Sequence, residues 1–207
     1  MLVSNELLDL SPVMPVVVVD EVADAVPVAK ALVAGGIRVI ELTLRTPVAL
    51  AAIEAVAGEV PEIVIGAGTV TTPDEAKQAA DAGAKFLVTP GCTERLLEAL
   101  SGTGLPFLPG AASVSEAMRL AEHGVTAMKF FPAEASGGIA YLKAIAGPLP
   151  GLRFCPTGGV TIRNAPEYLA LSTVGCVGGT WLTPKDAVAA KDFDRITALA
   201  AEAAALR

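Results

Sequence analysis

The 207-residue chain is 53% hydrophobic and 18% charged, and it carries a formal net charge of −7 at pH 7. This length allows one domain with a large core, so we expect residues 1–207 to form a single domain. The acidic charge and the lack of a basic run argue against nucleic acid or an anionic membrane surface as a partner. The first apolar run, residues 13–19, follows no basic segment and is far too short to cross a membrane, so we expect a cytoplasmic protein.

Apolar segments rich in strand-forming residues alternate along the chain with alanine-rich segments of helical length. The expected strands are residues 13–19, 37–44, 62–68, 85–90, 105–109, 125–132, 152–157 and 173–181. The expected helices are residues 22–34, 47–58, 73–82, 93–101, 113–123, 137–146, 163–170 and 192–206. Two of these helices begin with a capping-box pattern, at residues 72–75 and 113–116. Alternation of strand and helix implies parallel strands, and eight such units predict a compact, closed (β/α)8 TIM barrel.

A repeated spacing places two charged residues at matching positions in this barrel. Three expected helices end in a glycine that is followed by a strand, and Glu41 and Lys129 each lie five residues after such a glycine. They belong to the second and sixth strands, which stand opposite each other in an eight-stranded barrel. Alternate strands contribute side chains to the same interior layer, so we expect Glu41 and Lys129 to face each other across the barrel axis.

Lys129 is the most informative residue of the chain. At the two-residue period of a strand it shares one face with Ala127 and Phe131, and its neighbours on both faces are apolar. A solvated lysine at a strand edge is the alternative reading. A lysine buried in such a strand is less readily charged than one in water, and an uncharged amine can attack a carbonyl to form a Schiff base.

The second strand carries polar residues on one face. Glu41, Thr43 and Arg45 alternate with leucine and isoleucine, which would pack against helices. An amphipathic edge strand with solvated charges would show the same pattern. If the polar face points inward, Glu41 can move protons, and Arg45, near the carboxyl end of the strand, can bind a carboxylate or phosphate with two hydrogen bonds. The active site of a barrel enzyme lies at that end.

Glycine-rich strand ends indicate where a ligand could approach the backbone. The third and fourth strands end in residues 66–69 and 89–91, and the last two strands carry the pairs Gly158-Gly159 and Gly178-Gly179. Loops after the seventh and eighth strands of barrels often bind phosphate through backbone N–H groups. Ordinary turn chemistry is the alternative explanation for each glycine.

Cysteine and histidine usage argues against a disulfide framework and against a catalytic zinc. The three cysteines, Cys92, Cys155 and Cys176, form no close pair, so we interpret them as core or near-site thiols. The single histidine, His123, precedes Gly124 at an expected helix C-terminus, where both residues are favoured. We therefore expect a reaction without a metal.

Taken together, four motifs make the chain resemble the 2-keto-3-deoxy-6-phosphogluconate (KDPG) and 4-hydroxy-2-oxoglutarate (KHG) aldolase family. The resemblance covers nearly the whole chain in order. Its motifs are Glu41-Leu42-Thr43-Leu44-Arg45-Thr46, Gly66-Ala67-Gly68-Thr69, Lys129-Phe130-Phe131-Pro132-Ala133-Glu134 and Arg153-Phe154-Cys155-Pro156-Thr157-Gly158-Gly159. It implies a cofactor-independent class I aldolase of the Entner-Doudoroff pathway, built as a homotrimer of (β/α)8 barrels.

The resemblance also implies a role for each matching residue. Lys129 would form the Schiff base, and Glu41 would transfer protons. The expected pyruvate-binding residues are Arg45, Thr69, Pro90 and Phe131. The expected phosphate-binding residues are Gly158, Gly159, Gly179 and Thr180, and Thr157 is a further expected substrate-binding residue. Thr180 departs from the serine that is more frequent in the family, although it keeps the hydroxyl group.

Three other functions remain open from the sequence. The substrate could be the C4 epimer, 2-keto-3-deoxy-6-phosphogalactonate. A phosphate-binding barrel could also be an isomerase or epimerase that works without covalent chemistry, or a catalytically silent binding protein. A buried Lys129 argues against the isomerase, and a facing pair of Glu41 and Lys129 argues against the silent barrel.

Overall fold

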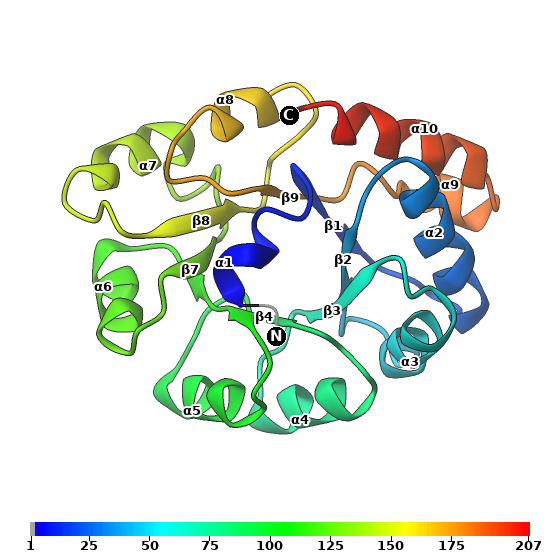
Figure 1. Ribbon diagram of the computed structural model, residues 1–207, viewed down its shortest axis with the longest axis horizontal. Helices are drawn as coiled ribbons and strands as arrows, with labels where there is room; N and C mark the ends of the chain where they lie inside the picture. The colour runs from blue at the N-terminus through cyan, green and yellow to red at the C-terminus, as the bar shows by residue number, and fades with distance from the viewer. Residues whose placement is uncertain (1–2) are drawn as a thin grey trace.

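The structure, a computed structural model, describes residues 3–207, so residues 1 and 2 of the expected domain lie outside the described residues. Parallel strands form a closed ring, and the helices surround it (Figure 1). The strands are β1 (Val13–Val17), β2 (Val39–Thr43), β3 (Val64–Gly68), β4 (Leu87–Val88), β5 (Phe107–Leu108), β6 (Gly110–Ala111), β7 (Ala127–Phe130), β8 (Arg153–Pro156) and β9 (Val177–Gly179). The helices are α1 (Ser4–Leu7), α2 (Val22–Ala34), α3 (Ala49–Glu59), α4 (Pro73–Asp81), α5 (Glu94–Gly102), α6 (Val114–Glu122), α7 (Gly138–Ala146), α8 (Ala165–Leu169), α9 (Lys185–Ala189) and α10 (Phe193–Ala204).

The order of the strands closes the ring and confirms the predicted barrel. Parallel pairing runs β5-β4-β3-β2-β1-β9 in one sheet and β6-β7-β8 in the other. Bridges from Phe154 to Val174 and from Thr157 to Gly178 join β8 to the β9 region. At the other seam, β5 and β6 lie on either side of Pro109, whose carbonyl accepts a hydrogen bond from the Lys129 N–H at 3.0 Å.

Several details differ from the sequence-based expectation, and the observed strands β4 and β9 are shorter than the expected ranges 85–90 and 173–181. The fifth strand, expected at residues 105–109, is two short pieces that flank Pro109 and reach Ala111, because proline has no N–H to donate to a strand ladder. The short helices α1 and α9, of four and five residues, lie outside all of the expected helices. The two expected capping boxes, Thr72 with Glu75 and Ser113 with Glu116, are present.

Apolar side chains pack in two layers. Inside the ring, Met14, Phe86 and Ala127 belong to an inner cluster, whereas Met128 and Phe130 of β7 pack outward toward the helices. This alternation along β7 is the two-residue period that the sequence predicts for a strand buried on both faces. It directs Lys129, two residues after Ala127, to the interior of the barrel.

Helix α1 lies across the centre of the ring in Figure 1 and covers its amino-terminal end. Leu7 and Leu8 are fully buried in the inner cluster. Asp9 pairs with Arg153 at 2.6 Å, and the side-chain hydrogen bond from Arg153 lowers the pKa of Asp9. The carboxyl ends of the strands, where barrel enzymes hold their substrates, are at the opposite end. In residues 3–207 no helix is long and apolar enough to span a membrane.

Candidate active site

A buried ion pair lies at the centre of the barrel. The amine Nζ of Lys129 on β7 donates to Glu41 on β2, at 3.0 Å from Oε1 and 3.4 Å from Oε2. The exposed fractions of the two side chains are 6% for Lys129 and 1% for Glu41. The structure thus brings together the two residues that matched spacing placed opposite each other. Each charge offsets the desolvation of the other, and removal of either would leave an unpaired buried charge.

Glycine on the neighbouring strand makes room for the carboxylate. Gly68 at the end of β3 lies so close to Glu41 that a Cβ atom there would be 2.1 Å from Oε1. Such a distance is far inside van der Waals contact, so any larger residue at position 68 must displace the Glu41 side chain. Gly68, for which the sequence left open ligand access or an ordinary turn, therefore makes room for the Glu41 side chain.

Phe131 and Pro90 form the surroundings of the Lys129 amine. Nζ lies 5.4 Å from the centre of the Phe131 ring, within the range of a cation–π interaction. Gly110, paired with Lys129 in the ladder, allows the Pro90 carbonyl to approach, because a Cβ at position 110 would be 2.2 Å from that oxygen. The buried Thr89 hydroxyl accepts a hydrogen bond from the Gly110 N–H at 3.1 Å.

Arg45 and Thr69 form a polar pair above Lys129, at the carboxyl ends of β2 and β3. The Arg45 Nε donates to the Thr69 hydroxyl at 3.3 Å. Within residues 3–207, no Asp or Glu oxygen lies within 4.0 Å of the Arg45 guanidinium, so its planar fork can bind an external carboxylate. Thr69 has φ = 59°, a left-handed conformation that is costly for a threonine and is often found at functional sites.

The loop after β8 presents backbone groups to the same space. Gly158 and Gly159 have φ values of 99° and 81°, which favour glycine. Two hydrogen bonds hold the loop, from Ala133 N–H to the Thr157 carbonyl at 2.8 Å and from Glu134 N–H to the Gly158 carbonyl at 3.1 Å. In the part of the chain that the structure describes, neither glycine donates its own N–H to a protein group. These donors are available to an anion.

These groups share one cavity of about 230 Å³. It is lined by Val16, Arg45, Thr69, Pro90, Lys129, Phe131, Thr157, Gly158, Gly159, Val160, Gly178, Gly179 and Thr180. The lining contains every site residue expected from the sequence except Glu41. The Glu41 carboxylate contacts the Lys129 amine but does not itself line the cavity. Val16 and Val160 were missed, because a valine carries no chemical signal of its own, whereas Gly178 was noted as a member of the Gly178-Gly179 pair. Thr43 is not part of the lining, since its buried hydroxyl donates to the Val17 carbonyl at 3.1 Å.

Cys155 and Cys176 lie together in the inner cluster, whereas Cys92 and His123 lie outside it. Cys155 and Cys176 are buried, and burial raises the pKa of the half-buried Cys92 to about 11. His123 caps the end of α6 and lies 3.3 Å from Glu94. Over residues 3–207 there is no group of three His, Cys, Asp or Glu side chains placed to hold a metal ion.

Comparisons with known proteins agree on one family. Residues 4–199 match the family described as "KDPG and KHG aldolase". The 2-dehydro-3-deoxy-phosphogluconate aldolase of Dickeya dadantii is 52% identical over 98% of this chain and 95% of its own length. The KHG/KDPG aldolase of Escherichia coli K12 is 52% identical over 97% of this chain and 94% of its own. A crystal structure of KDPG aldolase from Legionella pneumophila, with pyruvate captured as a covalent carbinolamine intermediate, superposes with a TM-score of 0.95 at 47% identity, covering 97% of this chain and 98% of that one.

Proposed function

This chain belongs to the KDPG and KHG aldolase family, and on that basis we propose that it is a class I aldolase that cleaves KDPG to pyruvate and glyceraldehyde 3-phosphate. It also cleaves 4-hydroxy-2-oxoglutarate to pyruvate and glyoxylate, as the name of its E. coli relative suggests. The observation that carries this proposal is the buried contact of 3.0 Å between Lys129 and Glu41 beside a cavity large enough for a small sugar acid. An amine and a proton acceptor at this distance are the two groups that Schiff-base chemistry requires.

Lys129 starts the reaction. Transfer of its ammonium proton to Glu41 leaves an uncharged amine, which adds to the C2 ketone of the substrate and forms a carbinolamine. Glu41 then returns this proton to the carbinolamine hydroxyl, which leaves as water, and the step gives an iminium ion and restores the Glu41 carboxylate. The ring of Phe131, 5.4 Å from Nζ, lies where it can stabilise this positive charge.

Glu41 then carries protons for the cleavage step. Its carboxylate takes the C4 hydroxyl proton, directly or through a water molecule, and the C3–C4 bond breaks. The electron pair of this bond moves into the iminium and forms an enamine of pyruvate, while C4 becomes the aldehyde carbon of the other product. Protonation of the enamine at C3 and hydrolysis of the iminium release pyruvate and restore the Lys129 amine.

Two sets of groups hold the ends of the substrate. The unpaired fork of Arg45, with Thr69, binds the pyruvate carboxylate, next to the Pro90 backbone. At the other end, N–H groups of the loops at residues 157–159 and 178–180 bind the phosphate, helped by the Thr180 hydroxyl. Both ends therefore present donors to an anion, although the protein as a whole is acidic.

The same site suits the phosphogalactonate epimer, because only the configuration of the C4 hydroxyl differs. Kinetics on both epimers separate the two substrates. An isomerase or epimerase, in contrast, leaves the carbon skeleton intact. Enzyme-coupled detection of pyruvate released from KDPG is therefore the direct test, and absence of pyruvate would contradict the aldolase assignment.

A homotrimer in the cytoplasm is the remaining part of the proposal. The trimer rests on the resemblance to the family, and light scattering coupled to size-exclusion chromatography tests it by molar mass. The cytoplasmic location is supported by three cysteines that form no disulfide, as is typical of a reducing compartment. Cell fractionation with an antibody against the protein tests the location.

A further inference from the structure

A second hollow of about 280 Å³ adjoins the active-site cavity. Val16, Arg45 and Thr180 line both spaces, so the proposed binding groups for the two ends of the substrate lie on their common wall. The second hollow is also lined by Val18, Thr183, Pro184 and Lys185. A lysine therefore lines the same hollow as Thr180, whose hydroxyl is proposed to bind the phosphate.

The local chain holds Lys185 at this place. After β9 the backbone turns, with the Thr183 N–H donating to the Thr180 carbonyl at 3.3 Å. Thr183 is buried, and Pro184, with φ = −59°, leads directly into the first residue of α9, which is Lys185. Only the flexible side chain of Lys185 remains free to move.

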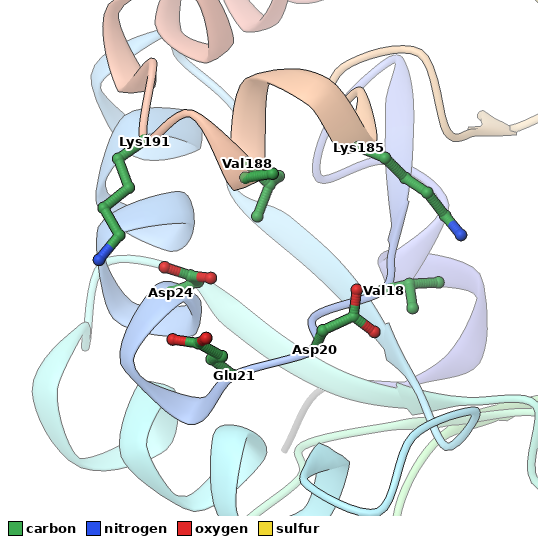
Figure 2. Close-up of a pocket in the computed structure, with 8 residues that line it drawn as sticks. Val18, Asp20, Glu21, Asp24, Lys185, Val188 and Lys191 are labelled. Carbon is green, nitrogen blue, oxygen red and sulfur yellow. The ribbon is translucent and has the colours of Figure 1, made fainter.

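The charge of Lys185 is not neutralised by a neighbour. The next residue, Asp186, pairs with Arg195 at 2.7 Å, whereas no carboxylate oxygen of residues 3–207 lies within 4.0 Å of the Lys185 amine. Figure 2 shows the adjoining cavity, where the Lys185 amine lies on the side of Val18 and points away from Asp24 and Glu21. Lys191 stands at the opposite end of that cavity, and it lines neither the active-site cavity nor the second hollow.

We propose that Lys185 is a substrate-binding residue that contacts the phosphate of KDPG and sets the preference for a phosphorylated substrate. This inference rests on the proposed function. A phosphate monoester carries a charge of about −1.5 to −2 at pH 7. The N–H groups of the glycine loops carry no net charge, and Arg45 is engaged with the carboxylate at the other end. Lys185 supplies the full positive charge that the phosphate end otherwise lacks, and its three N–H donors adapt to a phosphate oxygen.

The test compares two variants that remove the same charge from the same face. Lys185→Gln removes the proposed contact, and Lys191→Gln is the matched control. With Lys185→Gln we expect the KM for KDPG to rise by about 3- to 10-fold, a modest factor because the side chain is exposed and screened by salt. We expect kcat to stay unchanged, and inorganic phosphate to become a weaker competitive inhibitor by a similar factor. Lys185→Arg should restore the KM, and Lys191→Gln should leave it unchanged.

The unphosphorylated substrate distinguishes a local contact from a general loss. The KM of Lys185→Gln for 4-hydroxy-2-oxoglutarate should match that of the parent protein, because this shorter molecule does not reach the phosphate site. An unchanged KM for KDPG in Lys185→Gln, or an equal rise for both substrates, overturns the role of Lys185. Failure of the aldolase assignment itself would look different, since the parent protein would then release no pyruvate from KDPG.

Discussion

Glu41 and Lys129 lie 88 residues apart in the chain, yet their side chains meet at 3.0 Å inside the barrel, where both are almost completely buried. An isolated charge buried at this depth would be strongly unfavourable. Each of the two charges therefore offsets the desolvation cost of the other. The pair holds the proposed nucleophile beside its proposed proton acceptor before any substrate arrives. Its geometry leads to separate expectations for the two residues and for the glycine that supports them.

Replacement of Glu41 by glutamine tests its role in proton transfer. Glu41→Gln keeps the shape of the side chain and its ability to accept a hydrogen bond from Lys129, but it removes the basic group. We expect kcat for KDPG cleavage to fall about 10²-fold or more, with an unchanged circular dichroism spectrum. Normal turnover by a folded Glu41→Gln variant would exclude the residue from the mechanism.

Gly68 gives a prediction that arises from the structure alone. A methyl group at this position would lie 2.1 Å from the Glu41 Oε1 atom, so Gly68→Ala should push the carboxylate away from Lys129 and lower kcat by at least about tenfold. Gly58→Ala is the control, because nothing lies within 4 Å of a Cβ there and alanine favours the helix by about 1 kcal/mol. If Gly68→Ala were as active as Gly58→Ala, Gly68 would not position Glu41.

Much of this site could be predicted from the sequence because its information is local and periodic. The glycine-to-strand spacing places Glu41 and Lys129 at one level, and alternation along β7 directs Lys129 inward. The regular helices and strands followed from apolar periodicity and caps, as at Thr72.

Other features depend on contacts between segments that are distant in the chain, and such features could not be predicted from the sequence. From the sequence, Gly68 could serve ligand access or a turn. Its close approach to the Glu41 side chain is visible only in the structure. Val16 enters the cavity wall because β1 pairs with β2, which its own neighbours do not reveal. Helix α9 was missed, and with it the position of Lys185 beside the second hollow.

The Thr180 hydroxyl leads to a prediction about substrate preference. Both substrates present the same pyruvate half to Lys129, so only their other ends can discriminate. We expect a higher kcat/KM for KDPG than for 4-hydroxy-2-oxoglutarate, and Thr180→Val should reduce the former about tenfold through loss of a hydrogen bond to a charged group. Activity on 4-hydroxy-2-oxoglutarate is the internal control and should change little. Equal or better use of this shorter substrate by the parent protein would refute the phosphate assignment.

Chelation tests whether the electron sink is the iminium. In a class I mechanism the Schiff base on Lys129 withdraws the electron pair of the breaking bond, so a metal has no task in that step. We expect kcat/KM for KDPG to be unchanged after exhaustive dialysis against EDTA. Loss of activity that added zinc restores would show that the assigned mechanism is wrong.

The most direct test of the account is reductive trapping of pyruvate on the protein. Borohydride reduces an iminium to a stable secondary amine, so mass spectrometry of the digested protein identifies the lysine that formed it. We predict one pyruvate adduct, on Lys129, and none in a Lys129→Met variant treated in the same way. An adduct on Lys185 or on any other lysine, or no adduct in the active parent protein, would contradict the assignment of Lys129 as the Schiff-base residue.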